Sequence, residues 1–523
     1  MGFEDSYLSL EMTEYFFQPT FLMILLCLGL YLWLSQSSKL PLPPGPTPLP
    51  LIGNVHQLLR ANSMRKLQEL HAKYGPIMTL KVGSRTVIML GSRDVVRDLF
   101  EKRAKNFSSR PRLIIISEYM LRNIAPITMP YNDKWRAMHQ IEAVALNARV
   151  AKAVQPVILS LSRCLLFRLL ESKDFEIQLQ AFSCNIFTTL LYGEDLDSTP
   201  EEVAKAISDS VAHFLGALTV QSSLVEMFPF LERVPGLTAS AKARGDAIFN
   251  DIIRLHHPKI KTAVKSPMWT LTRAMEQKRQ ERSDITFDEF LAVPIEAFGA
   301  GVGSTPLTLG TIASMILMHP EEAQKVQTEI DKQVGFARLP EFSDEENLPY
   351  LQAFIHETLR AMTMSSIGMP HAVSEEDTYM GYRIPKDAII FPFQWALNQD
   401  EKTYQDPTTF NPQRWIDDPS LPQPAGFGFG KRVCPGQPFV HHTLLLIMAC
   451  LVWGFELEGT EEFYKLLDGR GSSAFYRPPT KFIRLKCKSP GHREIIEREW
   501  GKIDTNPTEM LRNIGASLGY EDC

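Results

Sequence analysis

The sequence predicts a mainly helical protein with small β-sheets, preceded by one membrane-spanning helix. Three observations predict this class. Residues 351–360 carry apolar side chains at helical spacing. Residues 82–90 are typical of a strand, and residues 94–103 are typical of a helix. Residues 21–34 form an apolar run without a charged side chain, which indicates a segment buried in lipid.

The apolar run is long enough to cross a bilayer. Extended back to residue 15 it forms a helix of about 30 Å. A cleaved signal peptide is the competing interpretation, but acidic residues precede the run and the first basic residue is Lys39. Basic residues at 39, 60, 65 and 66 follow the run, so the positive-inside tendency places the rest of the chain in the cytosol. We therefore expect residues 1–38 to be a single-pass anchor.

A single cysteine lies in a glycine-punctuated turn over residues 427–436, which read FGFGKRVCPG. A thiolate that binds a metal must be deprotonated, and a cation at Arg432 together with a helix N-terminus is expected to lower the pKa of Cys434. Pro435 suits the first position of that helix. Gly436 is expected to leave room for a flat, bulky group whose acidic edge could pair with Arg432. The alternative is an inert, buried cysteine.

Five positions of this turn, Phe427, Gly430, Arg432, Cys434 and Gly436, closely resemble the haem-binding loop of the cytochrome P-450 family of haem-thiolate monooxygenases. The resemblance implies that the cofactor is haem b and that Cys434 supplies its axial thiolate. It also implies that Arg432, Phe427 and Gly436 contact the haem.

The resemblance extends over roughly residues 40–500 and implies one mostly helical unit with the cytochrome P-450 fold. Length alone, 523 residues of which 44% are hydrophobic, would favour several domains. We expect a proline-rich hinge at 39–50, a catalytic domain at 51–500 and a C-terminal tail at 501–523. The hinge contains the sequence PLPPGPTP, which favours a semi-rigid polyproline segment, although an ordinary flexible linker is the alternative.

A second motif pairs Glu357 with Arg360, which share one helical face because they are three residues apart. Residues 410–415, FNPQRW, resemble the family segment whose arginine joins this pair. The resemblance implies a structural cluster of Glu357, Arg360 and Arg414 behind the cysteine loop. A solvated surface ion pair is the alternative.

Three further residues are implied as haem contacts. Residues 131–139 resemble the family helix in which a tryptophan and a basic residue reach the haem propionates, which assigns Trp135 and His139. The chain departs from the family here, because His139 stands where arginine or lysine is usual and Arg136 is a possible substitute. His371 matches a position that often donates to a propionate. Its alternative is a surface histidine at the start of a strand.

The expected central helix contains the sequence AFGAGVGST, where the family usually has an acid followed by threonine. In register, Gly303 replaces the acid and Ser304 the threonine, followed by Thr305. We expect Ser304 and Thr305 to carry proton delivery. The three glycines predict a kinked or thinned helix, and Pro306 should free the Val302 carbonyl to hold a water. Close packing of the helix against the haem is the alternative explanation for the glycines.

In the family, the loop that corresponds to residues 113–119 roofs the substrate pocket. Bulky apolar residues are the candidates for its lining, and plain core packing is their alternative. They suggest an apolar substrate of moderate size. The candidates are Ile115, Tyr119, Phe214, Leu218, Phe298, Ile367 and Phe475.

Composition narrows the partners. The formal charge is −5 and no basic block indicates nucleic-acid binding. Seven scattered cysteines form no disulfide framework, which favours a reducing compartment. The sequence has no dinucleotide or flavin motif of the Gly-x-Gly-x-x-Gly type, so electrons are expected from an NADPH-dependent flavoprotein reductase.

The sequence therefore predicts a haem-thiolate monooxygenase, anchored in the endoplasmic reticulum membrane with its catalytic domain in the cytosol. Several segments resemble the fungal branch of secondary metabolism, so the expected substrate is a lipophilic small molecule oxidised with dioxygen. Two alternatives stay open. The same fold could catalyse rearrangement, dehydration or ring expansion without net oxygen insertion, because Gly303 replaces the acid. A non-enzymatic haem-binding protein would need only Cys434.

Overall fold

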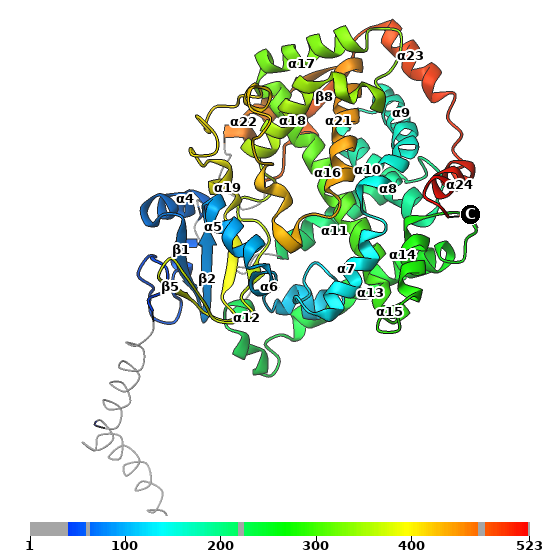
Figure 1. Cartoon of the computed structure of the whole chain (residues 1–523). Coiled ribbons are helices and arrows are strands. Elements are labelled where there is room, and N and C mark those ends of the chain that lie inside the picture. The colour runs from blue at the N-terminus through cyan, green and yellow to red at the C-terminus, as the bar shows by residue number, and fades with distance from the viewer. Residues whose placement is uncertain (1–22, 24–39, 59–62, 218–223, 469–475, 521–523) are drawn as a thin grey trace, which may run out of the picture.

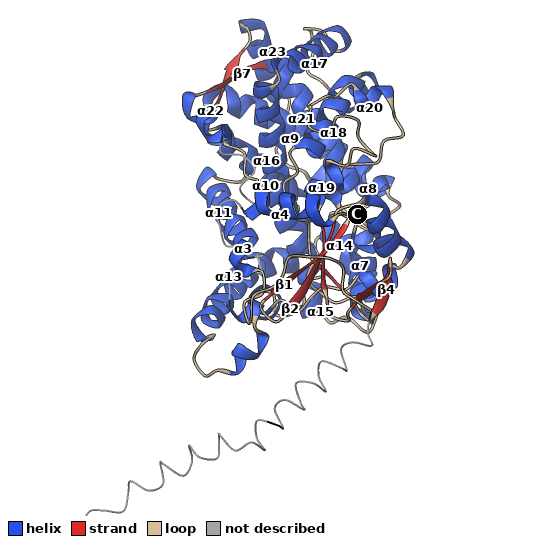
Figure 2. Cartoon of the chain, turned by 90° about the vertical axis from the view of Figure 1, so that its left-hand side faces the viewer, coloured by secondary structure: helices blue, strands red, loops and turns tan. Residues whose placement is uncertain are grey.

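The structure is a computed structural model that describes residue 23 and residues 40–58, 63–217, 224–468 and 476–520. Apart from residue 23, the predicted membrane anchor lies outside the described residues. The described part is mainly helical with small β-sheets, as predicted (Figures 1 and 2).

Long helices form most of the molecule (Figure 1). Helix α10 shows how local sequence sets their ends. It begins after Asp174, whose side chain accepts a hydrogen bond from the Ile177 N–H, and ends at Gly193 with a φ of 74°. The longer helices are α4 (Ser63–Tyr74), α7 (Asp133–Ala143), α9 (Gln155–Glu171), α10 (Phe175–Tyr192), α11 (Glu201–Ala217), α13 (Ala239–Ala263), α14 (Leu271–Gln280), α16 (Ala292–Met318), α17 (Pro320–Gln333), α18 (Pro349–Ala361), α21 (Gln437–Gly454), α23 (Pro490–Trp500) and α24 (Thr508–Ser517).

Shorter helical segments connect these. They are α3 (Val55–Leu58), α5 (Arg93–Val96), α6 (Ala104–Phe107), α8 (Ala148–Ala153), α12 (Leu224–Met227), α15 (Phe287–Phe290), α19 (Gln394–Asn398), α20 (Arg414–Asp417) and α22 (Glu461–Asp468). Two further segments are π-helices, which are wider than α-helices: η2 (Arg97–Lys102) and η3 (Ile114–Met120). Short 3₁₀ turns are η5 (Pro229–Arg233), η6 (Phe342–Asn347), η7 (Ala425–Phe427), η8 (Gly430–Arg432) and η9 (Thr480–Phe482).

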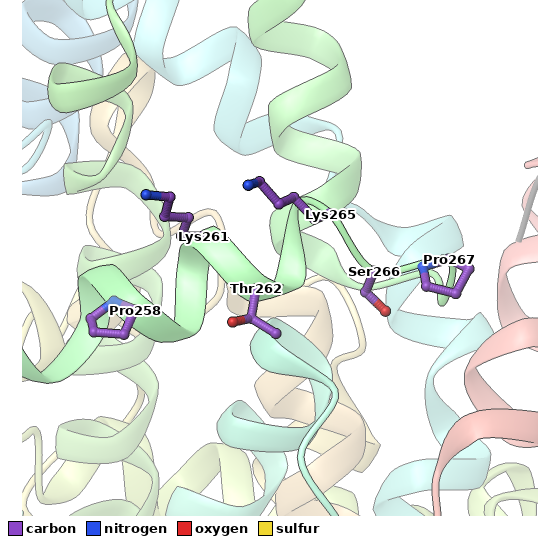
Figure 3. A pocket seen from close by; sticks show the side chains of 6 residues that line it. All are labelled: Pro258, Lys261, Thr262, Lys265, Ser266 and Pro267. Atoms are coloured by element: carbon purple, nitrogen blue, oxygen red, sulfur yellow. The ribbon is translucent and has the colours of Figure 1, made fainter.

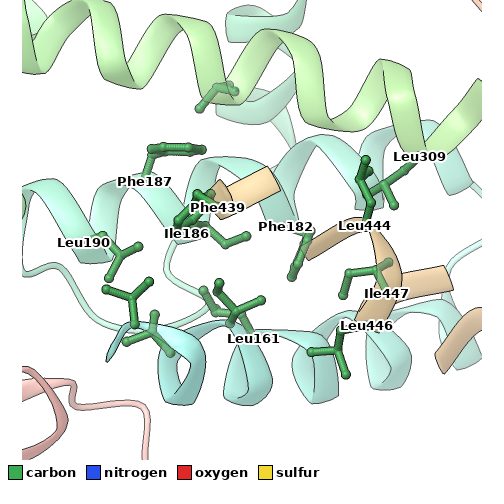
Figure 4. Packing of buried hydrophobic residues seen from close by; sticks show 14 of the residues in the cluster. Leu161, Phe182, Ile186, Phe187, Leu190, Leu309, Phe439, Leu444, Leu446 and Ile447 are labelled. Atoms are coloured by element: carbon green, nitrogen blue, oxygen red, sulfur yellow. The ribbon is translucent and has the colours of Figure 1, made fainter. Parts of the chain in front are cut away.

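The main hydrophobic core lies where α9, α10, α16 and α21 pack together (Figure 4). Residues such as Phe182, Leu309 and Ile447 interdigitate there. Two helices of the described part are long and apolar enough to cross a membrane, residues Phe287–Met318 and Gln437–Gly454, but 61% and 67% of their most apolar windows are buried inside the domain. A helix that is apolar on every side and buried by its neighbours belongs to a protein core.

A four-stranded sheet has the order β1-β2-β6-β3, with β1 (Ile77–Val82) antiparallel to β2 (Arg85–Leu90) (Figure 2). Strand β6 (Ile389–Pro392) runs parallel to β2, and β3 (His371–Ala372) is antiparallel to β6. Two hairpins complete the strands, β4 (Asp377–Tyr379) with β5 (Tyr382–Ile384) and β7 (Phe455–Gly459) with β8 (Ile483–Cys487).

Two local predictions need correction. The strand predicted over 82–90 is interrupted by a hairpin turn, because Gly83 takes a φ of 59° and the second strand begins only at Arg85. The loop expected over 113–119 is the π-helix η3, whose first turn is fixed by the Glu226 carboxylate accepting a hydrogen bond from the Ile115 N–H at 2.7 Å. The helix predicted over 94–103 is present as α5 followed by η2.

Segments near both ends of the described chain pack onto the rest of the fold. The proline-rich segment lies beside β1, where the Pro44 carbonyl accepts a hydrogen bond from the Thr79 N–H at 2.8 Å. At the other end, Leu511 and Ile514 of α24 are buried in the main core. The Thr505 carbonyl accepts from the Leu196 N–H at 2.8 Å. Residues 501–520, which the sequence assigns to a tail, therefore fold against the helical body.

Candidate functional site

The cysteine loop is a tight turn between η7 and α21. The Cys434 N–H donates to the Phe427 carbonyl at 2.8 Å, which closes the loop. Gly428 and Gly430 have φ values of 76° and 58°, a region that favours glycine. A Cβ at Gly430 would stand 2.1 Å from the Phe100 carbonyl oxygen, so this position also permits a close backbone approach.

The start of α21 differs from the expectation. Pro435 precedes the helix, which begins at Gln437 with Gly436 as its N-cap residue, and the proline of the first turn is Pro438. A Cβ built at Gly436 would meet, among the described residues within 4 Å, only the Cys434 Sγ at 3.9 Å. Apart from the flanking residues, no other described side chain lies within 4 Å of that Cβ, which leaves room for a group beside the thiol.

The pKa of Cys434 was expected to be low, and this expectation is wrong for the protein alone. Burial raises the pKa of the Cys434 thiol, while the N–H groups of Gly436 and Gln437 act in the opposite direction with smaller effect. The sequence motif predicts the cation of Arg432 and a helix N-terminus beside the thiol, but it does not predict how deeply Cys434 is buried. A thiolate at this depth requires a compensating cation, such as a metal ion that it ligates.

Arg432 is held beside this loop by three carbonyl oxygens. It donates to Ser108 at 2.9 Å, to Pro126 at 3.0 Å and to Met129 at 2.6 Å. Its guanidinium also lies 4.2 Å from the centre of the Trp135 ring. Burial is the largest of the influences that lower the pKa of Arg432 to about 8.

A second buried guanidinium, Arg110, was missed by the sequence analysis. It donates to the Ile127 carbonyl at 2.9 Å and to the Pro370 carbonyl at 2.6 Å. Burial lowers its pKa to about 10. Within the described residues, the contacts of Arg110 and Arg432 are carbonyl oxygens and an aromatic ring rather than ion pairs with carboxylates. Two such cations held together form a site for an anionic group.

His371 begins β3 and is buried rather than exposed. Its ring stacks on Phe100 with centroids 4.1 Å apart, and its Nδ1 lies 2.8 Å from the Phe107 carbonyl. Burial, followed by the charge of Arg110, holds the pKa of His371 well below its usual value. The neutral ring must carry its proton on Nδ1 to bond that carbonyl, so Nε2 is an acceptor. Donation from Nε2 to a carboxylate therefore requires the protonated ring.

Trp135 and His139 lie on α7. Trp135 is buried, and the His139 ring stacks on it with centroids 4.8 Å apart. His139 Nδ1 lies 3.3 Å from a Glu142 carboxylate oxygen. Arg136, the possible substitute, is exposed and pairs with Asp133 at the start of the helix. It therefore does not replace the basic side chain of the family.

Glu357, Arg360 and Arg414 lie together in the interior. Glu357 and Arg360 form two hydrogen bonds, at 2.7 and 2.9 Å, and the Arg414 Nε reaches the same carboxylate at 3.2 Å. The Trp415 indole and the Asn411 N–H also donate to Glu357, at 2.9 and 2.8 Å. All three charged side chains are at most 8% exposed. The carboxylate thus has four donor groups, which offset its desolvation.

The central helix α16 is held against α10 by its glycine and proline positions. A Cβ at Gly301 would stand 1.9 Å from the Phe187 ring, so this glycine permits close packing of two helices. The Val302 carbonyl that Pro306 frees accepts a hydrogen bond from the Gln180 side chain at 3.0 Å. A protein donor therefore takes the place of the expected water.

Ser304 and Thr305 lie on different faces of α16. Ser304 is half-buried and its hydroxyl donates to the Ala300 carbonyl at 2.8 Å. Ala300, four residues earlier on the same face, is exposed. Thr305 is 4% exposed and lies on the packed side with Val302. Of the two expected residues, Ser304 is the one on the accessible face.

The expected pocket residues are scattered. Tyr119 packs against α13 and donates to Glu232 at 3.2 Å, and Phe298 is buried against the His256 ring, with centroids 4.8 Å apart. Ile115 and Ile367 are half-buried. Leu218, Phe475 and the side chain of Phe214 lie outside the described part.

A surface hollow of about 660 Å³ opens beside the end of α13 (Figure 3). It is lined by Pro258, Lys261, Thr262, Lys265, Ser266 and Pro267. None of these residues belongs to the cysteine loop or to the arginine site, so this hollow is separate from the candidate site.

A cysteine in a glycine-closed loop with two buried guanidiniums held by carbonyls is typical of a haem-thiolate protein. A model of the cytochrome P-450 family matches residues 43–483, and the chain belongs to this family. The family implies haem b with the cysteine thiolate as axial ligand, and the residues present fit this group. The open space beside Gly436 and the anion site of Arg110 and Arg432 accommodate a flat ring system with carboxylate substituents.

The relatives are fungal enzymes. The chain is 33% identical to the cytochrome P-450 monooxygenase FrzL of Cladobotryum sp. over 513 residues, which cover 96% of this chain and 98% of the relative. It is 31% identical to the cytochrome P-450 monooxygenase aneD of Aspergillus aculeatus, with 90% and 92% covered. The corresponding values for astF of Aspergillus oryzae are 32%, 90% and 90%.

Proposed function

We propose that this protein is a monooxygenase that oxidises a lipophilic small molecule of fungal secondary metabolism, using dioxygen and electrons from an NADPH-dependent flavoprotein reductase. The observation that carries the proposal is the closed cysteine loop, with room for a group beside the Cys434 thiol and Arg432 fixed by three carbonyls. The names of the relatives, all monooxygenases, support the reaction class.

In this proposal the Cys434 Sγ ligates the iron, and Phe427 and Gly436 border the ring. Arg110 and Arg432 bind the propionates, with Trp135 beneath the Arg432 guanidinium. Bound haem supplies the reductive activation of dioxygen. Three carbonyl contacts keep Arg432 in place, so its guanidinium would already be positioned to bind a propionate.

His371 and His139 have narrower roles in the proposal. His371 would donate to a propionate only in its protonated form, because its Nδ1 proton is already used at the Phe107 carbonyl. His139 supports the Trp135 ring by stacking on it. Ser304 is proposed to hold and relay a proton on the accessible face of α16, and Thr305 supports the packed face of that helix.

We also propose that the domain lies against the endoplasmic reticulum membrane on the side of its proline-rich segment. Exposed apolar residues gather from two parts of the chain, and a hollow of about 390 Å³ is lined by both. Leu51 is 86% exposed and Phe230 is 60% exposed. The contributing residues are Leu49, Leu51 and Ile52 from the first part and Leu224, Phe230, Val234 and Leu237 from the second. An exposed patch of this kind is typical of a membrane contact.

A second candidate function is rearrangement, dehydration or ring expansion without net oxygen insertion. The glycine at position 303 favours this second function, because α16 has no carboxylate at that position. The Gln180 side chain also donates to the neighbouring Val302 carbonyl. In both candidate functions, Ser304 is a polar group on the accessible face of α16.

The two functions are distinguished with isotope-labelled dioxygen. Substrates are taken from the metabolites that accumulate when the gene is deleted, and the purified protein is supplied with reductase and NADPH. Monooxygenation adds one labelled oxygen to the product, whereas the second function changes the product without label. Absence of any turnover of the substrate, with or without NADPH, contradicts both functions and leaves a non-enzymatic haem protein.

A further inference from the structure

Glu296 lies on the accessible face of α16. Residues 296, 300 and 304 are four apart and share one face of a helix. Ala300 is exposed and both Glu296 and Ser304 are half-buried, whereas Val302 and Thr305 on the other side are buried. Glu296 is therefore the carboxyl group that α16 presents on the same side as Ser304.

One oxygen of this carboxyl group is fixed. The Ile127 N–H donates to the Glu296 Oε2 at 3.0 Å, and the Ile127 carbonyl accepts from Arg110 at 2.9 Å. The neighbouring carbonyls of Pro126 and Met129 hold Arg432. Glu296 is thus bound to the same short segment as both arginines. Within the described residues its other oxygen, Oε1, has no hydrogen-bond partner.

Burial and a neighbouring charge favour the protonated form of this carboxyl group. Burial, followed by the like charge of Glu142 on α7, raises the pKa of Glu296 to about 8. The Ile127 N–H and the charges of Arg432 and Arg110 act in the opposite direction but do not prevail. These groups come from α7, from the segments around Arg110 and Ile127, and from the cysteine loop. At neutral pH the Oε1 side can therefore donate a proton.

We propose that Glu296 is the proton donor on the accessible face of α16 and stands in for the acid that is missing at Gly303. The inference rests on the proposed function. Splitting dioxygen into a product oxygen and a water consumes two protons and two electrons, and the reductase supplies the electrons. In each transfer the O–H bond of Glu296 breaks and a new O–H bond forms on the accepting oxygen. The resulting carboxylate regains a proton from solvent water.

Glu296 and Ser304 are eight residues apart on α16, a rise of about 12 Å, so a chain of about three waters, or of waters and a polar group of the substrate, bridges the two side chains. Neither residue needs to move, because Ile127 fixes one and the Ala300 carbonyl fixes the other. Ser304 therefore acts as the near end of a relay that begins at Glu296.

The test uses the holoenzyme with purified reductase and NADPH and measures the fraction of consumed dioxygen that is released as hydrogen peroxide. Glu296→Gln keeps an oxygen that can accept from Ile127 but has no transferable proton. We expect the rate of water or product formation to fall about 10²-fold or more, with peroxide rising in its place. Asp288→Asn, which removes an exposed acid just before α16, is the control and should leave both unchanged.

A second-site variant separates proton supply from a structural role. Glu296→Gln combined with Gly303→Asp restores an acid to α16 and should recover most of the lost coupling. If Glu296 only pins the Ile127 segment, Glu296→Gln behaves like wild type because the acceptor is kept, and the inference is overturned. Loss of coupling without recovery in the double variant also overturns it.

A readout independent of turnover tests the protonation itself. The infrared C=O band of a protonated carboxyl should be present at pH 7, vanish above pH 8 and be absent in Glu296→Gln. The pKa of Glu296 in the folded protein lies above its value in the unfolded chain. The unfolding temperature of wild type should therefore fall relative to that of Glu296→Gln as the pH rises from about 5 to 8. No band at pH 7 contradicts the inference. If wild type shows no NADPH consumption at all, the proposed function fails first.

Discussion

The cysteine side of the site and the α16 side are built in different ways. On the cysteine side, the sequence motifs already imply that Glu357 pairs with Arg360 and Arg414, and its carboxylate receives four donor groups in all. On the α16 side, Gly301 and Val302 find their partners on α10, more than a hundred residues earlier in the chain. The family's motif is therefore kept around Cys434, whereas on α16 the usual acid is replaced by Gly303 and the helix makes its close contacts with α10.

The largest expected effect concerns the cysteine side. Glu357→Ala leaves two buried guanidiniums without their carboxylate and should lower the free energy of unfolding by about 3–5 kcal/mol. We expect the variant to lose haem on expression, measured as haem per protein. Glu376→Ala, which removes the partner of Arg383 in an exposed pair, is the control and should cost about 0–1 kcal/mol. Full haem loading of Glu357→Ala would show that the cluster is not needed to hold the haem.

A smaller effect sharpens the α16 side. Gly301→Ala places a methyl group 1.9 Å from the Phe187 ring and should destabilise by about 1–3 kcal/mol in urea unfolding. Gly299→Ala is the matched control, because its Cβ meets no atom within 4 Å and alanine favours a helix by about 1 kcal/mol. Equal effects of the two substitutions would mean that α10 and α16 do not pack as closely as described.

The smallest effect tests the carbonyl that Pro306 frees. Gln180→Met removes the donor to Val302 with little change of shape and should cost about 1–2 kcal/mol. In a Pro306→Ala background the backbone N–H of residue 306 can bond Val302 again, so the same substitution should cost less. A double-mutant cycle measures the difference. Additive effects would show that Gln180 and Pro306 are not coupled through this carbonyl.

Sequence and structure agree most closely where the chemistry is local. The turn of Gly428 and Gly430 and the helical spacing of Glu357 and Arg360 follow from neighbouring residues. How deeply Cys434 is buried could not be predicted, because burial depends on every element around the loop. For this reason its pKa is raised by burial rather than lowered as expected.

Long-range contacts explain what the sequence analysis missed on the α16 side. The Gln180 contact to Val302 joins residues 122 positions apart, and no spacing rule indicates it. Arg110 lies three residues before the loop that was predicted to roof the pocket, but only its burial and its carbonyl contacts indicated its role. Nothing in the sequence indicated a role for Glu296 except that it lies eight residues before Ser304 and therefore on the same face of the helix.

The central claim is that Cys434 binds haem iron as a thiolate. The most direct measurement is the absorption spectrum of the reduced protein with carbon monoxide, for wild type and for Cys434→His. The account predicts the long-wavelength band characteristic of thiolate-ligated haem in wild type. It predicts loss of that band in Cys434→His, with a matched haem content as control. An unchanged band in the variant would contradict the assignment.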